Sequence, residues 1–148
     1  MHRALFIGFA TLSLGAAAQS QVNPAGLKWG PAPPGLPAGA RLTVLSGDPT
    51  KEGMFTIRLR FPAGYAVQPH WHPTDELVTI IAGQMALGMG DKFDRAKAKS
   101  LVTGGYVVAP AKMNHYAFTR TGATIQITAH GPFEITYVNP VNDPRKRK

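Results

Sequence analysis

The sequence predicts an all-β protein, built as a sandwich or a barrel. The clearest evidence is a stretch in which apolar and polar side chains alternate. Its apolar positions are Phe55, Ile57, Leu59 and Phe61, and its polar positions are Thr56, Arg58 and Arg60. A period of two is typical of a strand with one buried face. About ten short segments of strand character are separated by turn residues, and no long segment has the period of a helix.

The first twenty residues are typical of an export signal. His2 and Arg3 precede an apolar segment, and small residues favour cleavage after Ala18 or Ser20. The segment is short and contains polar residues and glycines, whereas a membrane-spanning helix needs about 20 apolar residues. We therefore expect residues 1–20 to be a signal peptide, and the mature protein to be periplasmic or secreted, with no stable membrane anchor.

Residues 21–40 are rich in proline and glycine, which disfavour a regular strand. We expect an extended lead-in that wraps over the fold or is loosely ordered. Residues 41–140 form the predicted barrel, and residues 141–148 end in the basic sequence DPRKRK. One expected strand carries His70 and His72, and the next expected strand begins at Glu76. The other expected strands are 41–45, 55–61, 84–89, 101–102, 106–109, 115–120, 123–130 and 134–138.

Two further expectations concern the connections between these strands. Gly83 is expected to turn the chain between the strand that begins at Glu76 and the strand 84–89. Residues 90–100 (GDKFDRAKAKS) are polar and are expected to form a loop with at most one helical turn.

Composition excludes several kinds of chemistry. The chain has no cysteine, so disulfides, thiolate catalysis and thiolate metal ligands are ruled out. The formal net charge of +8 favours anionic partners only loosely. No aromatic stacking pattern accompanies the basic loop and tail, and export would separate the protein from DNA. We therefore predict solvated charge there and no nucleic-acid partner.

The chemistry-bearing residues gather in one stretch, GYAVQPHWHPTDELVTIIAG. His70 and His72 project to the same side of a strand because side chains alternate. Residues 73–75 form a plausible turn, and Glu76 begins the next strand. Two imidazoles and a carboxylate that converge from paired strands predict a metal site.

This stretch resembles the first signature motif of the cupin superfamily. Gly64, His70-x-His72, Glu76 and Gly83 occur at the defining spacing. The second cupin motif is partly matched by a later segment that contains Gly104, Pro110 and His115. This segment departs from the family pattern at Lys112, where the pattern often has glycine, and at Thr119, where it often ends in asparagine.

The resemblance covers roughly residues 55–138, and the C-terminal run GPFEITYVNPVNDPR is similar to small single-domain bacterial cupins. It implies a double-stranded β-helix (jelly-roll) barrel with His70, His72, Glu76 and His115 as metal ligands. Nitrogen and oxygen ligands without sulfur suit Mn, Fe, Ni, Cu or Zn, and an open octahedral site would favour Mn or Fe.

Two glutamines are weaker candidates for contacts to a ligand or to metal-bound water. Gln68 shares strand parity with His70 and would then face the cavity. Gln126 lies on one face of a late strand together with Thr128 and His130, and an inward orientation would bring it close to the metal.

The predicted function is an exported metal-binding cupin. If it is an enzyme, its metal would act as a Lewis acid or redox centre on a small anionic or enolisable substrate. Oxidation, decarboxylation and isomerisation all fit, and no catalytic residue is assigned. One alternative is a non-catalytic cupin that binds a small molecule or metal. Another is a barrel with an empty site that serves chiefly as a dimerisation module. A homodimer is the assembly that we consider.

Overall fold

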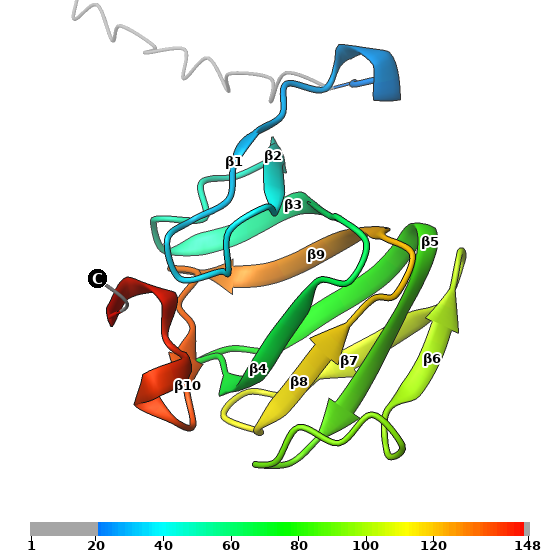
Figure 1. The fold of residues 1–148 in the computed structure, drawn as a ribbon. Coiled ribbons are helices and arrows are strands. Elements are labelled where there is room, and N and C mark those ends of the chain that lie inside the picture. Colours follow the sequence, from blue (N-terminus) through cyan, green and yellow to red (C-terminus); the bar gives the residue numbers. More distant parts are fainter. Residues whose placement is uncertain (1–20, 147–148) are drawn as a thin grey trace, which may run out of the picture.

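A computed structural model describes residues 21–146 of the chain. The predicted signal peptide, residues 1–20, lies outside the described residues. Ten strands and three short 3-10 turns make up the described part (Figure 1). The strands are β1 (Gly30–Pro31), β2 (Arg41–Ser46), β3 (Gly53–Phe61), β4 (Ala66–Trp71), β5 (Glu76–Met89), β6 (Lys99–Val102), β7 (Tyr106–Ala109), β8 (His115–Phe118), β9 (Ala123–Gly131) and β10 (Thr136–Tyr137). The 3-10 turns are η1 (Pro24–Gly26), η2 (Pro140–Asn142) and η3 (Pro144–Lys146).

The strands form two antiparallel sheets that curl around a common core (Figure 1). One sheet has the order β1-β2-β3-β9-β5-β7, and the other has the order β10-β4-β8-β5-β6. Strand β5 belongs to both sheets, since its first half pairs with β7 and β9 and its second half pairs with β6 and β8. This arrangement is the predicted jelly-roll barrel.

The core lies between the two sheets. On β3, Phe55, Ile57, Leu59 and Phe61 are all buried, as their alternation predicts. The inward residues of β9 match them, with Ile125 and Ile127 both buried. Burial of this apolar surface is the main force that closes the barrel.

The prediction of a turn at Gly83 is wrong, because β5 runs without a break from Glu76 to Met89. Gly83 instead allows a bend, since its φ of +78° is a conformation that glycine adopts readily. A Cβ at this position would collide with the carbonyl oxygen of Gly122. The bend lets one strand serve two sheets.

Other parts of the chain differ less from expectation. The lead-in wraps over the barrel and also pairs briefly, because Gly30 and Pro31 lie opposite Leu42 and Arg41. The loop after β5 contains turns but no helix, and β10 is shorter than its predicted strand. No helix among residues 21–146 is long and apolar enough to cross a membrane.

Candidate metal centre

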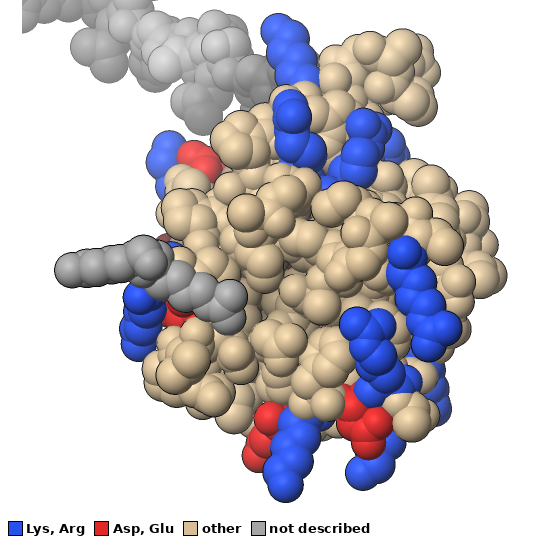
Figure 2. Space-filling model, viewed as in Figure 1, with Lys and Arg blue, Asp and Glu red and all other residues tan. Residues whose placement is uncertain are grey.

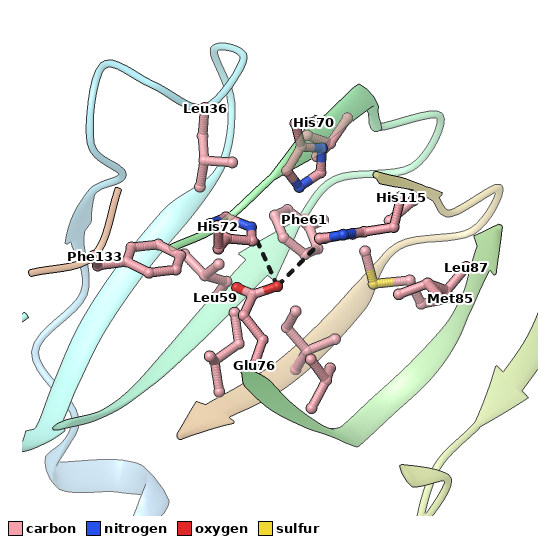
Figure 3. Close-up of a pocket in the computed structure, with 15 residues that line it drawn as sticks. Leu36, Leu59, Phe61, His70, His72, Glu76, Met85, Leu87, His115 and Phe133 are labelled. Atoms are coloured by element: carbon pink, nitrogen blue, oxygen red, sulfur yellow. Dashed lines mark ion pairs between the residues drawn. The ribbon is translucent and has the colours of Figure 1, made fainter. Parts of the chain in front are cut away.

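The four predicted ligands come together inside the barrel. His70 lies on β4, and His72 follows the end of that strand. Glu76 and His115 are the first residues of β5 and β8. His70 and His115 are direct cross-strand neighbours. All four side chains are buried and point toward a common centre (Figure 3).

Two turns beside the barrel wall position these residues. The backbone N–H of Lys112 donates to the carbonyl oxygen of His72 at 2.8 Å. The N–H of Ala111 donates to Asp75 Oδ1 at 2.7 Å. These bonds tie the turn that precedes Glu76 to the turn that precedes His115, so the ligands from β5 and β8 are placed together.

Lys112 itself has a φ of +60° and is the only non-glycine residue with a positive φ among residues 21–146. The family pattern often has glycine at this position. The lysine therefore adopts the backbone conformation that glycine favours, and the turn keeps its shape despite the departure from the motif.

Thr119, the other departure from the second motif, is also buried. Its side-chain oxygen accepts a hydrogen bond from the N–H of Gly122 at 3.0 Å. The hydroxyl thus stabilises the turn between β8 and β9, as a short polar side chain commonly does in turns.

The three imidazoles are oriented by backbone carbonyls. The Nδ1 atoms of His70, His72 and His115 lie 2.7, 2.6 and 3.0 Å from the carbonyl oxygens of Gln68, Glu134 and Met113. A carbonyl oxygen only accepts, so each Nδ1 carries a hydrogen and donates it. In a neutral ring the lone pair is then on Nε2. This is the tautomer in which Nε2 can bind a metal.

The distances within the group fit a metal centre. The ligand nitrogens of the three histidines all lie within 4.8 Å of one another, and they could bind a metal ion. Glu76 Oε2 lies 3.2 Å from His72 Nε2 and 3.5 Å from His115 Nε2 (Figure 3). Ligands about 2.1 Å from an ion are about 3.0 Å apart in octahedral geometry and about 3.4 Å apart in tetrahedral geometry.

Electrostatics also favour a cation between these groups. Burial lowers the pKa of His70 to about 3, with smaller contributions from His115 and His72. The pKa of His72 is lowered too, mainly by burial. Burial opposes ionisation of Glu76, but the attraction of His72 and a hydrogen bond with His115 together hold its pKa below the ordinary value. The result is an ionised carboxylate beside the Nε2 atoms of His72 and His115, where a bound metal would take the place of the hydrogens that these atoms otherwise direct at it.

The cavity around the centre is small and apolar. Its volume is about 50 Å³, which is room for a few water molecules. Besides the four polar residues its lining is aliphatic or aromatic. These lining residues are Leu36, Leu59, Phe61, Val67, Val78, Met85, Leu87, Ala117, Ile125, Ile127 and Phe133. Among the residues that the structure describes, no lysine or arginine reaches this cavity.

Neither predicted glutamine lines the cavity, so their expected orientation is wrong. The pairing of β4 with β8 shifts register between Val67 and His70, which both line the cavity. This irregularity breaks the parity that Gln68 was expected to share with His70. Gln126 lies on the outer side of β9, where its Oε1 accepts from Arg58 Nε at 3.1 Å. The apolar face of β9 is the one that faces inward.

Two cavity residues were not anticipated from the sequence. Phe133 stacks on the ring of His72, with centroids 5.2 Å apart and planes 11° apart. Leu36 reaches the same cavity from the lead-in (Figure 3). Both residues also line an adjoining outer groove. The sequence gives little sign of either residue. Leu36 is a single leucine between prolines, and Phe133 is an aromatic residue that follows a strand.

The barrel and its cluster of three histidines and a glutamate define a cupin. Residues 17–134 match the ChrR cupin-like domain, so the chain belongs to this family. No curated protein matches the chain in sequence.

Several solved structures share the fold. A putative acetylacetone dioxygenase from Methylibium petroleiphilum PM1 is 20% identical with a TM-score of 0.67, and the match covers 90% of each chain. The polyketide cyclase RemF from Streptomyces resistomycificus is 14% identical with a TM-score of 0.67, covering 87% of this chain and 92% of that one. An RmlC-like cupin from Shewanella frigidimarina is 15% identical with a TM-score of 0.59, covering 76% and 91%.

Proposed function

We propose that this protein binds a divalent transition metal through His70, His72, Glu76 and His115. The observation that carries the proposal is the convergence of three imidazoles, each with Nδ1 bonded to a carbonyl, on one ionised carboxylate. Nitrogen and oxygen ligands suit Mn, Fe, Ni, Cu or Zn, and a six-coordinate centre with open positions favours Mn or Fe.

Metal analysis of the purified protein tests this proposal. We expect about one metal ion per chain in the wild type and a large loss of metal in Glu76→Ala, which should remain folded. Glu134→Ala is the matched control, because it removes an exposed carboxylate and leaves the backbone carbonyl that accepts from His72. Equal metal content in the wild type and Glu76→Ala would reject Glu76 as a ligand.

We further propose that the protein is a metal-dependent enzyme of the oxidoreductase, decarboxylase or isomerase type. A bound metal would supply Lewis-acid or redox chemistry in the cavity. The small apolar lining without a cationic side chain favours a small enolisable substrate over a strongly anionic one. The similarity in fold to a putative acetylacetone dioxygenase supports the same substrate class.

Incubation of the metal-loaded protein with acetylacetone, with oxygen uptake and product formation monitored, tests this enzymatic proposal. Turnover that Glu76→Ala abolishes and Glu134→Ala retains would support it. Binding of the diketone without turnover, across Mn-, Fe-, Ni-, Cu- and Zn-loaded protein, would favour the alternative of a non-catalytic small-molecule or metal-binding cupin. That alternative is supported by the cavity itself, because the four proposed ligands are its only titratable lining residues among residues 21–146.

We also propose that the protein is exported and forms a homodimer. The N-terminal segment supports secretion to the periplasm or beyond, and the mature chain would begin after Ala18 or Ser20. Intact-mass measurement of protein purified from a secreting host tests the cleavage site. Analytical ultracentrifugation of the same sample tests for the homodimer.

A further inference from the structure

A second, polar cleft lies between the loop that follows β5 and the strands β5, β6 and β8. Its volume is about 150 Å³. The polar residues that line it are Gln84, Arg95, Ser100, Thr119 and Arg120, and the others are Ala86, Ala98 and Phe118. Figure 2 shows several Lys and Arg side chains on the side of the molecule where these strands lie.

The barrel wall separates this cleft from the metal centre. Side chains on a strand alternate between its two sides. On β5, Met85 lines the metal cavity and Ala86 lines the cleft. On β8, Ala117 lines the metal cavity and Phe118 lines the cleft. A molecule in the cleft would therefore contact none of the proposed metal ligands.

Packing of the loop positions one of the two arginines. The guanidinium of Arg95 lies over the ring of Phe118, 4.4 Å from its centroid, and 5.5 Å from the centroid of Phe93. Phe93 in turn packs on Tyr116, whose hydroxyl donates to the carbonyl oxygen of Asp94 at 2.6 Å. These contacts limit the freedom of Arg95 before any ligand binds.

The positive charge in the cleft is not neutralised locally. Among residues 21–146, neither Arg95 nor Arg120 forms an ion pair. The acidic residues of the same loop have other partners: Asp94 lies 3.9 Å from Lys97 Nζ, and Asp91 accepts from the amide of Asn114 at 2.7 Å. Two guanidinium groups thus share one cleft without a carboxylate.

Uncharged donors complete the site. The Gln84 amide donates to Ser100 Oγ, so the hydroxyl hydrogen of Ser100 remains available to a ligand. Planar guanidinium groups and a hydroxyl are the donors that proteins use for phosphate and carboxylate oxygens. We propose that this cleft is a binding site for a small oxyanion, as free phosphate or as the phosphate or carboxylate group of a small molecule.

Titration with inorganic phosphate at constant ionic strength tests the proposal. The readout is the chemical shift of the arginine side-chain Nε–Hε groups in NMR spectra. We expect saturable shifts for Arg95 and Arg120, and at least about fivefold weaker binding in Arg95→Gln and Arg120→Gln. A parallel titration with acetate shows whether a carboxylate is also accepted.

Arg60→Gln is the matched control. Arg60 is also an exposed arginine over an aromatic ring, 4.2 Å from the centroid of Trp29, but it lies on β3 and does not line the cleft. The substitution should leave phosphate binding unchanged. Equal weakening in Arg60→Gln would assign the binding to net charge alone. Either that result or the absence of saturable shifts in the folded wild type would overturn the proposal.

Discussion

At the scale of single residues, the backbone orients the side chains of the candidate metal centre. Three main-chain carbonyl oxygens orient the rings of His70, His72 and His115. The ligands were readable from the sequence, because alternation places His70 and His72 on one side of a strand and Glu76 begins the next. The resemblance to the second cupin motif added His115. The orienting groups were not readable, because every residue carries a carbonyl and only the folded chain shows which one faces a ring.

Burial of His70 makes the stability of the metal-free protein depend on pH. Its pKa is about 3 in the fold and 6.5 in the unfolded chain, so the unfolded state binds more protons between these values. The free energy of unfolding should therefore decrease as pH falls below 6.5, by about 2 kcal/mol at pH 5 from this residue alone.

Urea denaturation of chelator-treated protein between pH 7.5 and 5 measures this dependence. His70→Asn removes the titrating group. The slope of its unfolding free energy against pH should therefore be smaller than the wild-type slope, by the equivalent of about one bound proton. Equal slopes for the two proteins would contradict a buried, neutral His70.

The positive φ of Lys112 predicts a stabilising substitution. A non-glycine residue in this conformation costs roughly 1–2 kcal/mol, and glycine loses about 0.5–1 kcal/mol more backbone entropy on folding. Lys112→Gly should therefore increase the free energy of unfolding by about 0.5–1 kcal/mol. Thermal denaturation of Lys112→Gly beside Met113→Gly, its exposed neighbour with ordinary φ, measures the effect. Stabilisation by both, or by neither, would argue against strain at Lys112.

At the scale of elements, the lead-in covers the metal cavity. Leu36 lines the cavity, and two tyrosine hydroxyls bind the backbone on either side of it. Tyr65 donates to the carbonyl oxygen of Pro37 at 2.6 Å, and Tyr137 donates to that of Gly35 at 2.8 Å. Composition left two alternatives for this segment, wrapping over the fold or loose order, and the structure shows the first. Composition could not predict the contacts, which depend on tyrosines 28 and 102 positions away.

Loosening the lead-in should speed the exit of metal. Each lost hydroxyl bond is worth about 1 kcal/mol, or about fivefold in rate if the segment must open. Tyr65→Phe and Tyr137→Phe should each accelerate metal extraction by EDTA, with little change in equilibrium affinity. Tyr116→Phe is the control, because it loses a comparable bond to Asp94 on the other side of the barrel. Three equal extraction rates would exclude the lead-in as a cover.

At the scale of the whole molecule, the sequence predicted the fold class but not the way in which β5 joins the two sheets. Alternation in β3 and β9 indicated one buried face, and burial of that apolar face also explains the outward position of Gln126. The sharing of β5 between two sheets was not readable, because glycine permits both a turn and a bend. The close approach of Gly83 to Gly122, which requires glycine at the bend, arises only when the barrel is folded.

Metal should stabilise the entire barrel, because its proposed ligands come from β4, β5, β8 and the turn after β4. At a free metal concentration 100 times the dissociation constant, the gain is about 2.7 kcal/mol, or on the order of 10 °C in Tm. Thermal unfolding with metal and with EDTA measures it. Glu76→Ala should lose most of this difference, whereas Glu134→Ala should keep it. A wild-type Tm that is insensitive to metal would contradict a site built across these strands.

The carbonyl contacts of the histidines also bear on which sequence changes the family can accept. His70 and His115 each use the carbonyl two positions earlier, whereas His72 uses that of Glu134, 62 positions later. Since only main-chain oxygens are involved, the side chains at these three positions are free to vary without disturbing the tautomers. A one-residue insertion or deletion between β9 and β10 would move the partner of His72. Divergence in this segment should therefore proceed by substitution and spare its length.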